Sequence, residues 1–117
     1  MRRRTFLSAA GAAAVTLALS GAALAQETVK VGLILPMTGP FASTGRQIEA
    51  AAKLYMQQKG DTVAGKKVQL IVKDDTGVAD VTKRLAQELI VQEKVTVLGG
   101  FGLTPLAQAT APLATQG

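Results

Sequence analysis

The sequence predicts an α/β fold in which helices flank a parallel sheet. Three short apolar runs, at residues 29–35, 67–73 and 95–98, have the length and the aliphatic content of buried strands. Each run is followed by a loop rich in Gly, Pro, Asp or Thr and then by a segment with helical character. Such alternation of strand and helix is typical of a parallel sheet joined by right-handed crossovers.

The first strand leads into the most clearly marked helix. The run 29–35 continues through a loop rich in Gly and Pro into a helix that begins between residues 41 and 46 and ends at Gly60. The expected apolar stripe of this helix consists of Ile48, Ala51, Ala52 and Tyr55. Within this pattern, Tyr55 and Met56 are expected to pack inside the fold and not to contact a ligand.

The second and third units repeat the pattern. The strand at 67–73 follows a polar turn at 60–65 and precedes an amphipathic helix at 78–93. The expected apolar stripe of that helix consists of Val78, Val81, Leu85 and Leu89. After the third strand, Pro105 suits the first turn of a helix that ends near Ala114, because that position needs no amide hydrogen.

The composition argues against several function classes. The chain has 117 residues without Cys or His, so it lacks thiolate chemistry and the commonest general base and metal ligand. We therefore expect no enzyme activity, no metal site and no cofactor. The net charge is +5, but three of these charges are Arg2, Arg3 and Arg4. The remaining charges nearly balance and aromatic residues make up only 3%, so nucleic-acid binding is not expected.

Residues 1–25 have the organisation of a secretory signal peptide. A charged start is followed by a modestly apolar segment at 6–19, and Ala23 and Ala25 form a small-x-small cleavage site. Cleavage after Ala25 predicts a mature protein outside the cytoplasm, most simply in a bacterial periplasm. The run Arg-Arg-Thr-Phe-Leu at 3–7 also resembles the twin-arginine signal, and both export routes stay open.

Three motifs resemble known chemical sites without completing them. Gly39 and Gly45 are too far apart for a phosphate loop, and Arg-Gln follows them in place of Lys-Ser or Lys-Thr. The Gly-Gly-Phe-Gly run at 99–102 has the wrong spacing for dinucleotide binding. Asp74 and Asp75 could serve metal or acid–base chemistry, but no His or third carboxylate accompanies them. We interpret them as caps of a turn and of the next helix.

Three longer segments occur together in order. They read Val-Gly-Leu-Ile-Leu-Pro-Met-Thr-Gly-Pro-Phe-Ala-Ser-Thr-Gly at 31–45, Lys-Asp-Asp-Thr-Gly at 73–77 and Val-Leu-Gly-Gly-Phe-Gly-Leu-Thr-Pro at 97–105. Together they resemble the branched-chain amino-acid (Leu/Ile/Val) type of periplasmic substrate-binding protein of ABC transporters, over residues 28–117. The resemblance implies a type I periplasmic binding protein with two Rossmann-like α/β lobes, which close on a small molecule and deliver it to an inner-membrane permease. Residues 26–117 are then an incomplete N-terminal lobe.

The resemblance also implies two ligand loops in this lobe. The position of Thr44 often carries a hydroxyl or aromatic side chain that faces the cleft. The loop after the third strand supplies Phe101, Gly102, Leu103 and Thr104. Amino-acid binders commonly have Ser at the position of Leu103, so Phe101 and Leu103 could instead line a pocket for an aromatic or aliphatic acid. Capping of the helices is the alternative role of Thr44 and Thr104.

The predicted function is non-enzymatic capture of a small carboxylate-bearing solute, either an amino acid or an aromatic or aliphatic acid. A ligand-sensing receptor domain with the same fold is the first alternative, and an enzyme that uses Asp74 and Asp75 is the second. One partial lobe leaves half of a ligand in water and one sheet edge unpaired. We therefore expect residues 26–117 alone to bind weakly and to self-associate.

Overall fold

A computed structural model describes residues 27–116, so the predicted signal peptide and its cleavage site lie outside the described residues. The elements are β1 (Thr28–Leu35), α1 (Ala42–Lys59), β2 (Thr62–Val63), β3 (Lys66–Asp74), α2 (Ala79–Val91), β4 (Val97–Gly100) and α3 (Thr104–Gln116). The predicted alternation of strand and helix is confirmed. Within the described range, no helix is both long and apolar enough to cross a membrane.

The four strands form one sheet in the order β2-β3-β1-β4. β1 is central: it pairs in parallel with β3 from Thr28↔Lys67 to Leu35↔Asp74, and with β4 from Val31↔Val97 to Ile34↔Gly100. The parallel arrangement of these three strands is as predicted. As a result, β1, β3 and β4 all end at the same edge of the sheet.

β2 departs from the sequence prediction. The segment predicted as a plain polar turn contains a two-residue strand that pairs antiparallel with β3. Ala64 and Gly65 form the connecting turn, and both have a positive φ, 51° and 79°. Positive φ at both central residues gives a hairpin turn whose twist matches that of the strands. Two exposed residues are too few to show the alternation by which a strand is recognised in a sequence.

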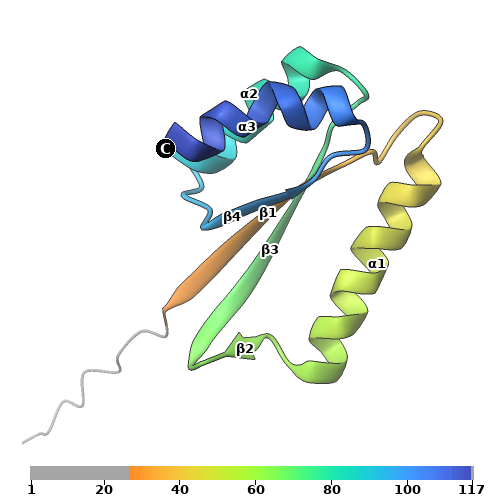
Figure 1. Cartoon of the computed structure of the whole chain (residues 1–117). Helices are drawn as coiled ribbons and strands as arrows, with labels where there is room; N and C mark the ends of the chain where they lie inside the picture. The colour runs from red at the N-terminus through yellow and green to blue at the C-terminus, as the bar shows by residue number, and fades with distance from the viewer. Residues whose placement is uncertain (1–26, 117) are drawn as a thin grey trace, which may run out of the picture.

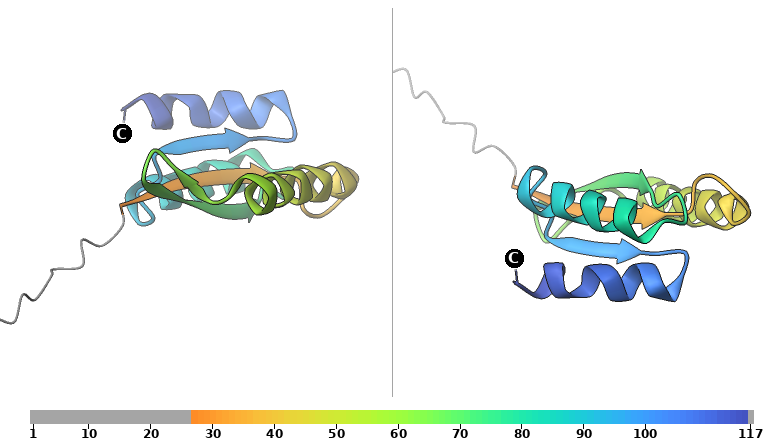
Figure 2. Two further views of the ribbon diagram at one scale, coloured as in Figure 1. Left: turned by 90° about the horizontal axis from the view of Figure 1, so that it is seen from below. Right: turned by 90° about the horizontal axis from the view of Figure 1, so that it is seen from above.

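The helices cover the two faces of the sheet unequally. In Figure 1, α1 lies on one side of the strands, while α2 and α3 lie together on the other side. The two turned views in Figure 2 show the same arrangement, with α3 beside β4. This is the result of right-handed crossovers: the chain moves from β1 to β3 over one face and from β3 back to β4 over the other.

The packed core lies between the sheet and α2. Ile34, Ala86 and Leu89 are fully buried and form its centre, and Val95, Leu98 and Phe101 are among the side chains packed against it. Gly32 permits this close contact, because a Cβ at that position would lie 3.0 Å from Leu89 Cδ1. The α2 helix can therefore pack directly against the backbone of β1.

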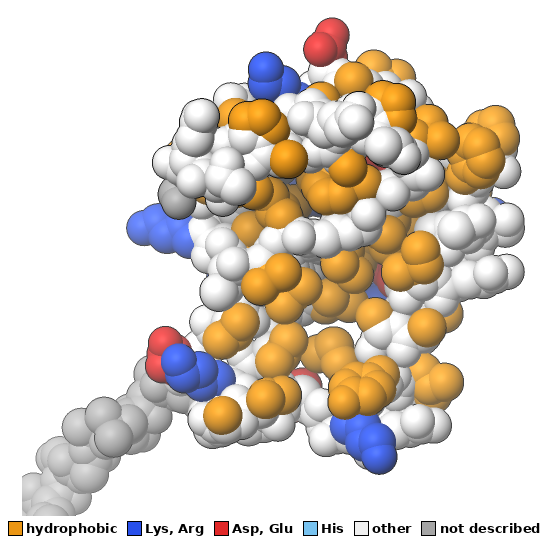
Figure 3. Space-filling model, viewed as in Figure 1, with side chains coloured by type: hydrophobic (Ala, Val, Ile, Leu, Met, Phe, Trp, Pro, Cys, Tyr) orange, Lys and Arg blue, Asp and Glu red, His pale blue; other side chains and the backbone are white. Residues whose placement is uncertain are grey.

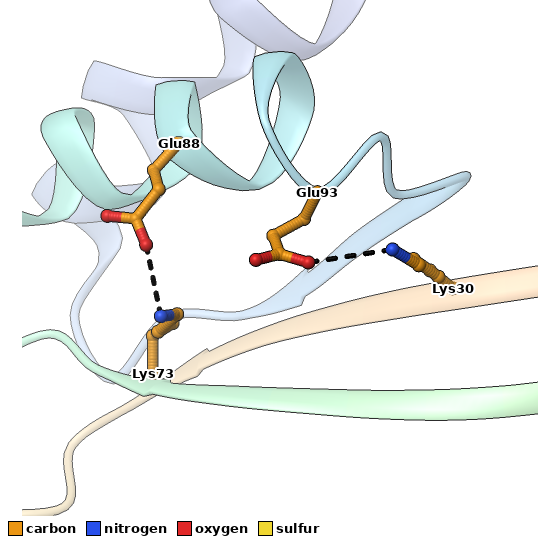
Figure 4. Close-up of polar contacts among 4 residues, drawn as sticks. All are labelled: Lys30, Lys73, Glu88 and Glu93. Carbon is orange, nitrogen blue, oxygen red and sulfur yellow. Dashed lines mark hydrogen bonds and ion pairs between the residues drawn. The ribbon is translucent and has the colours of Figure 1, made fainter.

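Two ion pairs border this core and join the sheet to α2 and its following turn. Lys73 Nζ lies 3.1 Å from Glu88 Oε1, and Lys30 Nζ lies 3.5 Å from Glu93 Oε2, as Figure 4 shows. All four side chains are partly exposed, so each pair is expected to contribute only about 0.2–1 kcal/mol to stability.

The inward face of α1 differs from the predicted stripe. Ala42 and Gly45 are buried and Ala52 and Met56 are half-buried, whereas Ile48 and Tyr55 are 43% and 65% exposed. The prediction that Tyr55 packs inside the fold is therefore wrong, while Met56 is partly packed. The small residues Ala42 and Gly45 let the start of α1 approach the loop after β1. This contact, and not the helical spacing of the apolar residues, determines which face of α1 turns inward.

The third strand begins two residues later than predicted, at Val97. Lys94 has a positive φ of 54°, and the amide of Val95 donates to the carbonyl of Leu89 at 3.0 Å. Val95 therefore closes the end of α2 and packs in the core instead of pairing in the sheet. For the same reason α2 ends at Val91, before the predicted Glu93. Its buried residues are Thr82, Ala86 and Leu89, so of the predicted stripe Leu89 is buried. Val81 and Leu85 are half-buried, and Val78 is 48% exposed.

Candidate functional site

Three loops meet at the carboxyl edge of the parallel strands. They are residues 36–41 after β1, residues 75–78 after β3 and residues 101–103 after β4. Because the strands are parallel and β1 lies between the other two, the loops are neighbours in space although they are far apart in the sequence. In open α/β sheets, ligands bind beyond this edge.

Asp74 joins the first two loops. Its Oδ1 accepts hydrogen bonds from the amides of Met37 and Thr76, both at 3.0 Å, and its Oδ2 accepts one from the Thr38 hydroxyl at 2.7 Å. Burial alone would raise the pKa of the Asp74 carboxyl, but these hydrogen bonds to the charged form together hold that pKa below its ordinary value. The ionised form therefore holds the β1 loop against the β3 loop.

Asp75 joins the last two loops. It is only 1% exposed, and its Oδ1 accepts from the amide of Gly77 at 2.7 Å, while its Oδ2 accepts from the amide of Gly102 at 3.2 Å. The predicted role of the two aspartates in capping a turn is confirmed by their bonds to Thr76 and Gly77. The predicted capping of the next helix is wrong, because Val78 occupies the N-cap of α2 and that position has no side-chain cap.

The β4 loop has a backbone that few sequences adopt. Gly100 and Phe101 both have a positive φ, 101° and 69°. A Cβ on Gly100 would collide with the carbonyl oxygen of Ile34, and the Phe101 amide donates to that same oxygen at 2.6 Å. A non-glycine residue in this conformation costs about 1–3 kcal/mol and persists only where its surroundings hold it. The fixed loop places Phe101 over the edge of the core.

Glycines bring the first and third loops into contact at Pro36. A Cβ on Gly102 would lie 2.8 Å from Pro36 Cγ, and a Cβ on Gly45 would collide with the Pro36 carbonyl oxygen. Gly45, the last residue of the run at 31–45, is therefore required by the close approach of α1 to the β1 loop. Phosphate binding is not needed to explain it.

Two small cavities open at this edge, and we name them by their position. The α1-side pocket, of about 140 Å³, is lined by Leu35, Pro36, Phe41, Thr44, Ile48, Gly100, Phe101 and Gly102. The β3-loop pocket, of about 250 Å³, is lined by Pro36, Thr38, Gly39, Pro40, Phe41, Asp75, Thr76, Gly77, Gly102 and Leu103. Pro36, Phe41 and Gly102 belong to both, so the pockets adjoin one another.

The structure brings most of the predicted site residues together. Thr44, Phe101 and Gly102 line the α1-side pocket, and Gly102 and Leu103 line the β3-loop pocket. Thr104 lines neither; it begins α3 and is exposed. Neither threonine hydroxyl makes a helix cap among residues 27–116, because the N-cap of α1 is Phe41, without a side-chain cap, and α3 begins at Thr104 itself.

Phe41 and Thr38 line the pockets but were absent from the predicted site. Phe41 is 49% exposed, and it lies at the N-cap of α1, where an apolar side chain satisfies no backbone group. An aromatic residue between Pro40 and Ala42, in a loop otherwise made of small and polar residues, was the available signal. The hydroxyl of Thr38 is already engaged with Asp74.

A larger hollow lies at the opposite end of the strands. It has a volume of about 860 Å³ and is lined by Thr28, Lys53, Met56, Gln57, Gly60, Asp61, Lys67, Val68, Gln69 and Leu70. Figure 3 shows hydrophobic side chains gathered between the sheet and α1 on this side of the molecule. Its open shape results from the sparse packing of α1, and it lies away from the edge where parallel sheets bind ligands.

The candidate site offers surfaces on which a ligand can bind. In the part of the chain that the structure describes, no three His, Cys, Asp or Glu side chains cluster as metal ligands would. Both carboxylates are engaged with backbone amides, so their oxygens serve the loops. The surfaces left for a ligand are apolar and aromatic side chains and the Thr44 hydroxyl, because the amides of Ala42, Thr44 and Gly45 at the start of α1 already donate to backbone carbonyls.

Comparison with known sequences gives consistent matches. The profile of the family described as periplasmic binding protein matches residues 28–117. The Leu/Ile/Val-binding protein homolog 6 of Brucella abortus (strain 2308) is 39% identical over 100 residues. That alignment covers 85% of this chain and 26% of the Brucella protein, so the chain spans about a quarter of the length of this relative.

Solved structures give the same fold. A solute-binding protein of an ABC transporter from Rhodopseudomonas palustris BisB5, solved in complex with 3,4-dihydroxybenzoic acid, is 66% identical, with a TM-score of 0.74 over 76% of this chain and 24% of that one. A leucine-binding protein, LivK, from Thermotoga maritima is 31% identical, with a TM-score of 0.69 over 75% of this chain and 25% of that one. Both superpose on the sheet and helices described above.

Proposed function

Since the chain belongs to the periplasmic binding protein family, of the Leu/Ile/Val-binding type, we propose that it forms part of the solute-binding component of an ABC importer. The solute is a small carboxylate, and a hydroxylated benzoate fits the site best. Binding takes place without catalysis, and the loaded protein delivers the solute to an inner-membrane permease. Export after cleavage at Ala25 places this capture in the periplasm.

The observation that carries the ligand class is the lining of the two adjoining pockets. Phe41, Phe101 and Leu103 present aromatic and apolar surface at the ligand edge of the sheet. A benzoate ring can pack edge-on or offset against such side chains. The 66% identity to a protein solved with 3,4-dihydroxybenzoic acid supports the same class of ligand for this chain.

Polar groups of the same pockets suit the two ends of such a ligand. The start of α1 lies beside the α1-side pocket, and the positive end of its dipole favours a carboxylate there, while the amides of Ala42, Thr44 and Gly45 already donate to the carbonyls of Gly39 and Phe41. Thr44 contributes a hydroxyl that no other group of residues 27–116 engages, so it is free to bond a ring hydroxyl or the carboxylate.

Leu103 separates this ligand class from the amino-acid class. An amino acid presents an ammonium group next to its carboxylate, and both need polar partners once they leave water. Leu103 offers none, and its side chain is 38% exposed at the mouth of the β3-loop pocket. The kinship with a leucine-binding protein keeps an amino acid as the competing ligand.

The open pockets indicate that this chain supplies only part of the contacts. Their volumes, about 140 and 250 Å³, are below or near the lower end of the range for ligand sites, which enclose most of a small molecule. We propose that a second lobe closes over the same edge and completes the enclosure. Residues 26–117 alone are therefore expected to bind the solute only weakly.

The test is calorimetry on the complete gene product with 3,4-dihydroxybenzoate, 4-hydroxybenzoate and leucine. We expect the aromatic acids to bind with a Kd of about 1 μM or below, and leucine to give no heat. Leu103→Ser is the variant to compare with the wild type, because it introduces at the mouth of the β3-loop pocket the hydroxyl that amino-acid binders commonly have. Tight binding of leucine without binding of either benzoate would overturn the ligand class.

A further inference from the structure

We propose that Asp74 and Asp75 are positioning residues that set the two ligand loops separately: Asp74 fixes the β1 loop and Asp75 fixes the β4 loop. The pair lies at the end of β3, and each carboxylate reaches across to a different neighbour. The consequence for ligand affinity rests on the proposed function. The assignment of each carboxylate to its own loop does not rest on the proposed function, and it can be measured without a ligand.

The Asp74 contacts are directed at the β1 loop. Its carboxylate receives the Met37 amide and the Thr38 hydroxyl, from residues that directly follow Pro36. The strand register explains why the Asp74 side chain reaches the β1 loop, because Asp74 pairs with Leu35, the last residue of β1. The side chain is therefore next to the point where the chain leaves the sheet towards Phe41 and α1.

The Asp75 contacts are directed at the β4 loop. Gly102, whose amide donates to Asp75, follows two residues with positive φ and lies in both pockets. The Phe101 amide is held by Ile34, and the Gly102 amide is held by Asp75. These two bonds fix successive peptide planes, so the direction in which Phe101 and Leu103 leave the loop depends on both.

A carboxylate is required at the Asp75 position. Both of its oxygens face N–H donors, Gly77 at 2.7 Å and Gly102 at 3.2 Å, and the side chain is buried away from water. An asparagine can accept only one of these bonds and directs its own NH₂ at the other donor. The shorter bond to Gly77 is the one expected to survive, so substitution releases Gly102.

The experiment measures amide hydrogen exchange on the complete gene product labelled with [¹⁵N]glycine and [¹⁵N]methionine. In Asp75→Asn, exchange at Gly102 is expected to accelerate about tenfold or more, with Met37 unchanged. In Asp74→Ala, which removes the oxygen that accepts the Met37 amide, exchange at Met37 is expected to accelerate while exchange at Gly102 stays unchanged. Asp80→Asn is the matched control, because it removes the same charge from the first turn of α2, where the carboxylate has no hydrogen-bond partner among residues 27–116.

Equal acceleration at Gly102 and Met37 in either variant would show a general loss of stability and would overturn the proposal. If Asp75→Asn does not fold, the wild-type protein decides: a Gly102 amide that exchanges as fast as that of the exposed Gly39 contradicts the bond. Affinity for 3,4-dihydroxybenzoate is measured on the same samples. We expect Asp75→Asn to weaken it about tenfold, with Asp80→Asn unchanged. Absence of wild-type binding refutes the proposed function and leaves the exchange result to judge the two carboxylates.

Discussion

The two faces of the sheet differ in how completely they are covered. On the face below α2, Ile34 and Leu89 are fully buried. On the face below α1, Leu35 is fully buried next to the start of the helix, but Leu33 is only half-buried, although it is the chain neighbour of Ile34. On α1 itself, Leu54 and Tyr55 are 52% and 65% exposed.

This difference shows that the burial of a helical side chain depends on the neighbouring helices as much as on the spacing of apolar residues in the sequence. α2 has α3 packed beside it, so its side chains are enclosed from two directions. α1 stands alone on its face among residues 27–116, and its buried residues, Ala42 and Gly45, lie near its start, where Gly45 approaches the loop after β1. An apolar stripe on a solitary helix stays partly in water, whatever its spacing.

The largest effect is expected from truncating one leucine side chain on each face of the sheet and comparing the two losses of stability. Leu89→Ala removes a fully buried side chain and should lower the free energy of unfolding by about 2–5 kcal/mol. Leu33→Ala removes the same atoms from the half-buried face and should cost about 1–2 kcal/mol. Urea unfolding followed by circular dichroism measures both, and equal losses would contradict the difference between the faces.

The second prediction breaks the attachment of α1 alone. Gly45→Ala places a Cβ against the Pro36 carbonyl oxygen, so the start of α1 must move away from the β1 loop. We expect a loss of about 1–3 kcal/mol. Protection of the α1 amides against hydrogen exchange should fall, whereas protection of the α2 amides should stay unchanged. Gly39→Ala is the control for added volume, since a Cβ there meets no atom within 4 Å, although its positive φ carries a cost of its own.

The third prediction concerns how the stability of the protein changes at low pH. The lowered pKa of Asp74 means that the folded state binds its proton less readily than the unfolded state. Its contribution to stability is therefore present above the ordinary carboxyl pKa of about 4 and is lost as the pH falls through the lowered value. Asp74→Asn should reduce the loss of stability on acidification in that window. An unchanged acid limb in urea titrations at a series of pH values would contradict the role of this carboxylate in holding the β1 loop.

The smallest effect on stability is expected on the outer surface of α1. Leu54→Lys and Tyr55→Ser together should change the unfolding free energy by no more than about 0.5 kcal/mol, because both side chains already lie mostly in water. The pair should nevertheless reduce self-association of the chain, since it removes exposed apolar area. Sedimentation velocity compares the two proteins at equal concentration. An unchanged distribution would show that these two side chains do not mediate the association, and β4, the edge strand of the sheet that residues 27–116 form, would be the next surface to test.

The sequence analysis predicted the order of elements because apolar runs and turn residues mark them locally. It missed β2, whose two exposed residues carry no pattern, and it placed the third strand two residues early because Val95 has the composition of a strand residue. The bond from the Val95 amide to Leu89 that decides this boundary depends on how α2 ends in three dimensions.

The candidate site was predictable to the extent that parallel strands end at one edge. Thr44, Phe101 and Gly102 meet for that reason. The bonds of Asp74 to Met37 and of Asp75 to Gly102 span tens of residues and depend on strand register, which a single sequence does not display. Thr104 was included because it follows Leu103 in the chain, but it begins α3 and lines neither pocket.

The central position of β1 also determines the order in which the chain can assemble. β1 is the first strand to be synthesised or translocated, yet β3 ends only at Asp74 and β4 only at Gly100. Each parallel pairing closes a long loop, and the entropy of that closure must be met before the contacts compensate for it. The Leu33–Leu35 segment therefore lacks its partner β3 until Asp74 has been made and the flanking strand β4 until Gly100 has been made, and over that interval its apolar side chains are open to aggregation.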